Sequence, residues 1–303
     1  MRTVSILVAR LSVFVLVVAG GCGAGEDASR AVALPMTPPS GWGPVHAASG
    51  GPWSAGEAEL LDATLFFVRE TLPPDDPRRG LVERAHYLAL DALAPEDGAT
   101  PPATEALFSV RTGNIYVEHP TPEKFPQLAS SLAHELHHME RDHTPSVNRM
   151  QECDRERVAH AREAEDVERM LVAVKLSPDA AHWLPSFELG HAKARALAAM
   201  YTSKFELFRL VQALDQVEGL REMSVLYAAY ERCIEVAKCA LATDHKAELV
   251  LLDELAAASR GSTAEALVAA PLQRARGAIE ACAPLQATVD LLRAKDRSRA
   301  PGR

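Results

Sequence analysis

The chain has 303 residues, of which 48% are hydrophobic and 24% are charged, and its formal net charge is −9. These values are ordinary for a globular protein and exclude a disordered, collagen-like or fibrous chain. An acidic chain also lacks the basic stripe that general nucleic-acid binding requires, so we expect no nucleic-acid partner.

The first segment, residues 1–21, has the pattern of an export signal. Arg2 and Arg10 form a short positive region, and the apolar stretch Leu11–Ala19 is too short to span a bilayer. The residues Ala19-Gly20-Gly21-Cys22 resemble a bacterial lipobox, whose cysteine is lipidated and becomes the mature N-terminus. We therefore expect an exported protein that Cys22 anchors to a bacterial membrane, at the outer membrane or the periplasmic face. A plain secretory peptide that is cut nearby is the alternative.

The remaining chain predicts a mixed but mainly helical protein. Residues 22–56 are rich in Gly, Ala, Pro and Ser and predict a flexible tether. Apolar residues at helical spacing then predict helices over Ala58–Leu72 and Leu81–Leu93. In Leu107–Glu118, two alternating runs around Thr112-Gly113-Asn114 predict a β-hairpin.

Everything from Pro122 onward reads as helix. One helix follows Pro122 and ends at Thr144-Pro145, and a second runs over Val147–Leu176. The later helices are expected to break near Pro185, Gly219, Gly261, Pro271 and Pro284. The predicted fold class is α+β, mainly α, with one domain over residues 57–176. A helical region over residues 177–303 follows it and ends in a basic tail.

The segment Leu132–His143 contains the motif H-E-x-x-H, as His134-Glu135-Leu136-His137-His138. Residues four apart lie one helical turn apart on the same face, so His134 and His138 can bind one metal ion. Glu135 lies beside the first histidine and can act as a general base toward water. We expect His137 to lie on a different face and to take no part.

On these residues, Leu107–Asp142 resembles the core of a zincin metallopeptidase. The resemblance implies a zincin-like domain with zinc as cofactor, His134 and His138 as ligands, and Glu135 as the catalytic base. It also implies a peptide or protein substrate. The strand Gly113–Glu118 would then be an edge strand that pairs with the substrate, or else an ordinary sheet strand.

A catalytic zinc needs a third protein ligand. The metzincin branch is not favoured, because Thr144 stands where its third histidine would be. The gluzincin branch takes a glutamate from a following helix, and stepping back one turn from Val167 selects Glu163. Glu156 and His160 are the alternatives on the same face. Asp166 is the candidate carboxylate for orienting a ligating histidine. The simplest alternative for this acidic helix is a solvated face with ion pairs.

Two other classes of protein compete with this prediction. The spacing Glu135-x-x-His138 and Glu188-x-x-His191 also occurs in ferritin-like di-iron bundles. A non-catalytic envelope lipoprotein that binds a partner through its helical region is the third class. If the chain is a hydrolase, an oxyanion donor must come from the downstream helices, where the candidates are Tyr201, Tyr227, Tyr230, His182 and His191.

Apart from Cys22, the chain has four cysteines, an even number in a chain expected to be exported. Two disulfides are therefore expected, with four buried free thiols as the alternative. Cys233 and Cys239 lie six residues apart on one predicted helix. Each is therefore expected to pair with Cys153 or Cys282.

Overall fold

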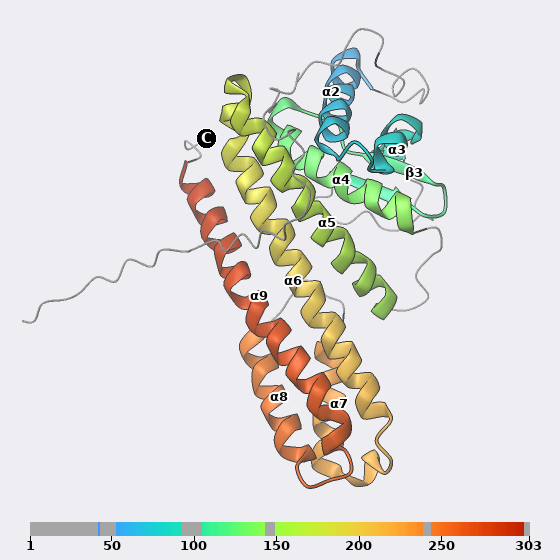
Figure 1. Cartoon of the computed structure of the whole chain (residues 1–303), viewed down its shortest axis with the longest axis vertical. Coiled ribbons are helices and arrows are strands. Elements are labelled where there is room, and N and C mark those ends of the chain that lie inside the picture. The colour runs from blue at the N-terminus through green and yellow to red at the C-terminus, as the bar shows by residue number, and fades with distance from the viewer. Residues whose placement is uncertain (1–41, 43–52, 93–104, 143–148, 239–243, 300–303) are drawn as a thin grey trace, which may run out of the picture. The chain divides into compact units, whose positions relative to one another are not determined.

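The computed structural model describes residue 42 and residues 53–92, 105–142, 149–238 and 244–299 (Figure 1). In this part of the chain, eight α-helices, α2 to α9, accompany one small three-stranded sheet. The predicted class, α+β and mainly α, is confirmed. The predicted export signal, most of the tether and Cys22 lie outside the described residues.

Helix α2 spans Ala55–Thr71 and begins at a capping box. The Ser54 hydroxyl accepts a hydrogen bond from the Glu57 amide, and the Glu57 carboxylate accepts one from the Ser54 amide. The helix predicted over Ala58–Leu72 is confirmed, and this cap moves its start three residues earlier.

The second predicted helix is only partly correct. Helix α3 spans Arg78–Arg84, and the chain then forms strand β1, Tyr87–Ala89, and a short 3₁₀ turn over Leu90–Ala92. The helix predicted over Leu81–Leu93 is wrong beyond residue 84. Parallel pairing with a distant strand outweighs local helix propensity there, and it buries Tyr87 and Ala89 completely.

The predicted hairpin is present as β2, Ala106–Ser109, and β3, Asn114–Val117. Its turn closes with Gly113 at a φ of 72°, a conformation that glycine adopts without strain. The strand order is β1-β3-β2, with β3 parallel to β1 and antiparallel to β2. Strand β3 is therefore central, and β2 is an edge strand.

Two long helices follow the sheet. A 3₁₀ turn over Pro122–Lys124 leads into α4, Phe125–Arg141, and α5 spans Arg149–Leu176. Both predicted helices are confirmed in their described parts. Helix α4 packs on α2, α3, β2 and α5, so it lies at the centre of the first half of the chain.

A first hydrophobic core joins the sheet, α2, α4 and α5 to the start of α6. Its fully buried members include Leu65, Phe67, Tyr87, Ile115, Phe125, Leu132, Leu136, Val167, Met170, Val174 and Phe187. Burial of this apolar surface fixes the helix that carries H-E-x-x-H against the sheet.

The C-terminal region is entirely helical, with α6 over Leu184–Asp215, α7 over Ser224–Val236, α8 over His245–Ser259 and α9 over Glu265–Arg299. Figure 1 shows α5, α6 and α9 running alongside one another, and α6 packs on both neighbours. The expected breaks at Gly219 and Gly261 are present as turns with positive φ. Pro271 and Pro284 lie inside α9 instead of ending it, and Pro185 occupies the first turn of α6.

A second hydrophobic core forms where α6 to α9 meet. It contains Leu207, Leu210, Leu214, Leu226, Ala229, Leu252, Leu255, Val268, Ala275 and Ile279. Helix α6 contributes Phe187 to the first core and Leu207 to the second, so one continuous helix passes through both. None of the described helices is long and apolar enough to cross a membrane.

The described cysteines differ from the expected pattern. Cys153 is disulfide-bonded, whereas Cys233 and Cys282 are buried free thiols. The prediction that Cys233 and Cys282 form disulfides is therefore wrong. The alternative, four free thiols, is also wrong, because Cys153 is bonded. Cys239 lies outside the described residues.

Candidate metal centre

Helix α4 presents the two histidines of H-E-x-x-H side by side. Leu128, Leu132 and Leu136 fix one face of the helix in the first core. His134 and His138 then project from another face, and their Nε2 atoms lie 3.0 Å apart. Both residues are buried, with 8% and 9% of their surface exposed. Two imidazole nitrogens therefore lie close together in a largely buried position.

Glu156 of α5 completes a three-residue group at this point. One carboxylate oxygen lies 3.5 Å from His134 Nε2, and the other lies 3.5 Å from His138 Nε2. The three side chains offer ligand atoms close enough together to hold a metal ion. The alternative ligand Glu156 is thus the carboxylate that faces both imidazoles on their Nε2 side.

Glu163, the sequence-based choice for third ligand, faces the opposite edge of His134. Its Oε2 atom lies 3.3 Å from His134 Nδ1 and 2.7 Å from His160 Nδ1. Ser130 donates a 2.5 Å hydrogen bond to its Oε1 atom. His134, His160 and Glu163 form a second group that could hold a metal ion. Both groups share His134, but only the first contains both histidines of the motif.

The carboxylate that contacts the second histidine is Asp142, one turn further along the chain. Its Oδ2 atom lies 2.5 Å from His138 Nδ1. Asp166, predicted for such a role, instead forms ion pairs with Arg78 and Arg169. The prediction for Asp166 is wrong, because its position on α5 directs it to the arginine of α3. The i,i+4 spacing from His138 could have identified Asp142.

Glu135 lies in the same cleft as the two histidines. Its Oε2 atom accepts a 2.8 Å hydrogen bond from the backbone amide of Phe108, on strand β2. The residue is 9% exposed, and burial raises the pKa of its carboxyl group. The sheet thus fixes one oxygen of the predicted base, a contact that no local sequence pattern predicts.

The charges around the histidines favour a cation. Burial lowers the pKa of His138, but hydrogen bonds with Asp142 and Glu156 outweigh this effect and raise it to about 9. Burial likewise lowers the pKa of His134, and contacts with Glu156 and Glu163 raise it well above its ordinary value. Burial raises the pKa values of both glutamates, but their contacts with the histidines bring them below the ordinary range. The carboxylates around the two imidazoles therefore stabilise positive charge at this position.

The group opens into a cleft of about 400 Å³. Residues of β2 line one wall, and residues of α5 and α6, including Tyr201, line the other. Tyr201 is thus the one oxyanion candidate that lines this cleft, and its ring stacks on His160 with the centroids 5.5 Å apart. The edge strand at the cleft is β2. The strand Gly113–Glu118 is the central strand β3, so its prediction as an edge strand is wrong and the alternative, an ordinary sheet strand, is confirmed.

Two remaining predictions concern histidines outside these groups. His137 is buried, and burial together with neighbouring positive charges lowers its pKa to about 4. It belongs to neither metal-capable group among the described residues, as expected for a bystander. Glu188 and His191, which the di-iron alternative requires, are also absent from both groups within the described chain.

Comparison with known proteins adds no relative. No family model, curated protein or solved structure matches the chain.

Proposed function

We propose that this protein is a zinc-dependent hydrolase of peptide bonds. The observation that supports this proposal most directly is the convergence of His134, His138 and Glu156 in a cleft that also contains Glu135. Two nitrogen ligands and one carboxylate, with a further position open to solvent, are the donor set of a catalytic zinc ion.

The spacing of the donor atoms fits this ion. A tetrahedral site with metal–ligand bonds of about 2.0–2.1 Å has edges of about 3.3 Å. The two Nε2 atoms lie 3.0 Å apart, and each lies 3.5 Å from a different oxygen of Glu156. In this proposal Glu156 is the third ligand, and Glu163 is the carboxylate that orients His134 through its Nδ1 atom. The histidine contact of Asp142 has the same function for His138.

When bound, zinc supplies a Lewis acid that polarises the scissile carbonyl and makes water acidic near neutral pH. Glu135 takes the proton of that water and later delivers it to the leaving amine. Burial raises the pKa of Glu135, so its carboxylate is a stronger base than an exposed one. The amide of Phe108 holds one oxygen of Glu135 and leaves the other free for the proton.

The walls of the cleft suit an extended peptide. In the described sheet β2 is an edge strand, and Ala106 to Phe108 line the cleft, so we propose that an extended peptide pairs along this strand. On the opposite wall, the Tyr201 hydroxyl is our candidate donor to the developing oxyanion. With the predicted lipid anchor at Cys22, we place the substrate among peptides or proteins of the cell envelope.

The test compares wild type with Glu135→Gln, which keeps the shape of the side chain and removes the base. Metal content is measured by mass spectrometry, and hydrolysis by a library of quenched fluorescent peptides. We expect one zinc per chain in both proteins and a loss of activity of about 10²–10⁴-fold in the variant. Chelation should abolish wild-type activity, and added zinc should restore it. A wild type without zinc, or a variant with full activity, would refute the proposal.

A further inference from the structure

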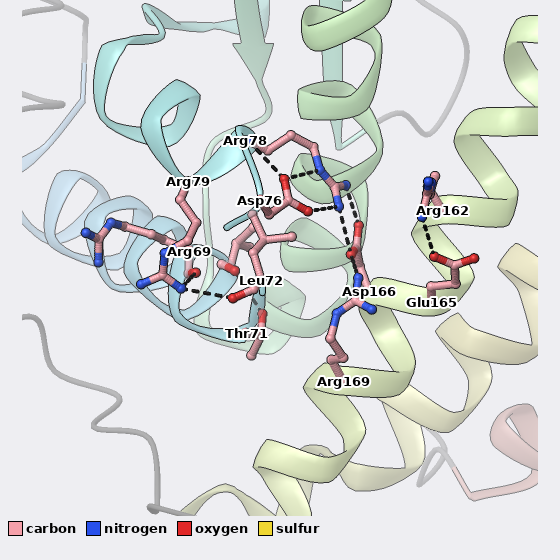
Figure 2. Close-up of polar contacts among 11 residues, drawn as sticks. Arg69, Thr71, Leu72, Asp76, Arg78, Arg79, Arg162, Glu165, Asp166 and Arg169 are labelled. Atoms are coloured by element: carbon pink, nitrogen blue, oxygen red, sulfur yellow. Dashed lines mark hydrogen bonds and ion pairs between the residues drawn. The ribbon is translucent and has the colours of Figure 1, made fainter. Parts of the chain in front are cut away.

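A buried ion-pair cluster lies on the same helix as the proposed ligand Glu156. Arg78, at the start of α3, is 3% exposed, and Asp166 of α5 is 1% exposed. Arg78 Nη1 donates a 2.6 Å hydrogen bond to Asp166 Oδ2, and Nη2 donates one of 3.2 Å to Oδ1. Figure 2 shows the guanidinium between Asp166 and Asp76, with Arg169 on the far side of Asp166.

The second carboxylate fixes the arginine itself. Asp76 accepts hydrogen bonds from the backbone amide of Arg78 and from its Nε atom, at 2.9 and 3.0 Å. A third bond, from Nη2, is 2.7 Å long. Asp76, in the loop that precedes α3, therefore fixes the guanidinium independently of its contact with α5. A planar fork that is fixed in this way accepts a carboxylate in only one position.

One face of helix α5 carries both the carboxylates near the histidines and apolar residues of the first core. Glu156 and Glu163 face the histidines of α4 from its first half. One and two turns after Glu163, Val167 and Met170 continue the stripe into the first core, and both are fully buried. A displacement of α5 along its axis would therefore move the carboxylates and the apolar side chains together.

Apolar packing by itself defines such a position loosely, because hydrophobic contact has no direction. A shift of one residue moves the helix by about 1.5 Å and turns it by about 100°. Metal coordination tolerates errors of only about 0.2 Å. Besides the hydrogen bond from Ser130 to Glu163, a directional contact on this stretch of α5 is the bidentate pair of Asp166, three residues after Glu163, with Arg78.

From this geometry we infer that the Arg78–Asp166 pair sets the register of α5 against α4 and thereby positions Glu156 and Glu163 at the metal. Arg78 and Asp166 are positioning residues, since neither contacts the histidines of the motif. The inference rests on the proposed metal site, and it gives a role to a pair of buried charges that does not line the cleft. Buried pairs are weak sources of stability, and fixing a register is their best-supported use.

The test measures metal affinity by competition with a chromogenic chelator, and ligand geometry by the visible spectrum of the Co²⁺-loaded protein. Asp166→Asn keeps the size of the side chain but removes its charge. Arg78→Lys keeps a charge but removes the fork. We expect each to weaken metal binding by about 10-fold or more and to alter the Co²⁺ spectrum, as loss of outer-shell support does in other metal sites.

Two control variants separate register from stability. Arg162 and Glu165 form an exposed pair on the same helix, also drawn in Figure 2, so Glu165→Gln should leave affinity and spectrum unchanged. Leu255→Ala opens a cavity in the second core and should lower the unfolding midpoint without changing metal affinity. If Asp166→Asn does not fold, Arg78→Lys alone decides the question.

The outcomes distinguish this inference from the proposed function. If wild type binds no metal, the proposed function fails and the inference with it. If wild type binds metal and the folded register variants retain wild-type affinity and spectrum, the inference is overturned while the proposed function stands. A loss of affinity of equal size in Leu255→Ala would also overturn it, because the effect would then follow general stability.

Discussion

The Oδ2 atom of Asp142 lies 2.5 Å from the Nδ1 atom of His138, one helical turn before it in the sequence. This contact holds the proton of the imidazole on Nδ1 and leaves the Nε2 lone pair directed at the metal-binding position. Arg155 lies 3.4 Å from the other oxygen of Asp142 and steadies the carboxylate.

Asp142→Asn is therefore expected to weaken zinc binding by about 10–100-fold while leaving the fold intact. Competition with a chromogenic chelator measures the affinity, and circular dichroism checks the fold. Wild-type affinity in a folded Asp142→Asn protein would show that the contact does not orient the ligand.

A second prediction concerns Glu156 and Glu163. Glu156 approaches the imidazole of His134 at Nε2, and Glu163 approaches it at Nδ1. If Glu156 is the ligand, Glu156→Gln should lose stoichiometric zinc. Glu163→Gln should bind zinc about 10–100-fold more weakly than wild type, as expected for an orienting carboxylate. Equilibrium dialysis of both variants in parallel measures the difference. The reverse order of affinities would assign the ion to the group formed by His134, His160 and Glu163.

In the second core, Lys204 and Glu248 form a buried ion pair, 2.6 Å long, whose side chains are 3% and 2% exposed. Lys204→Met leaves the carboxylate buried without its cation, so we expect a loss of about 3–5 kcal/mol in the free energy of unfolding. The double variant Lys204→Met with Glu248→Leu should regain most of this loss. Urea unfolding measures all three proteins.

The exposed pair Arg232–Glu254 supplies the matched control for this prediction. Glu254→Gln should change the free energy of unfolding by no more than about 0.5 kcal/mol, because water screens exposed charges. If Lys204→Met costs no more than Glu254→Gln, the variant does not leave Glu248 as the uncompensated buried charge that we expect.

The two free cysteines should be unreactive in the folded protein. Burial raises the pKa of the Cys233 thiol to about 12 and that of the Cys282 thiol to about 11. At pH 8 both groups therefore remain protonated, and the thiolate that reacts with iodoacetamide is nearly absent. Mass spectrometry should find both residues unlabelled in buffer and labelled in urea. Rapid labelling of either thiol in the native protein would contradict its buried position.

The sequence predicts the helix that carries the motif more reliably than the partners of its histidines. The stripe of apolar residues and the i,i+4 histidines are local properties of α4, and they survive into the fold. Helical stepping on α5 selects the face shared by Glu156, His160 and Glu163. It does not decide which carboxylate faces the Nε2 atoms, because that depends on how α5 crosses α4.

The wrong predictions for β1 and for Asp166 have the same physical cause. Strand β1 forms because β3, later in the chain, pairs with it, whereas local spacing predicts a helix for the same residues. Helical spacing predicts Asp166 as a partner for histidine, but the arginine that neutralises it lies 88 residues earlier. Contacts of this range depend on tertiary packing, which the pattern of one segment does not contain.

The continuity of α6 has a structural consequence. Its 32 residues span about 48 Å at a rise of about 1.5 Å per residue. Along that length, Phe187 is seated in the first core, Tyr201 lines the cleft and Leu207 is seated in the second core. A single unbroken helix therefore connects the first core, the cleft and the second core, with no loop between them.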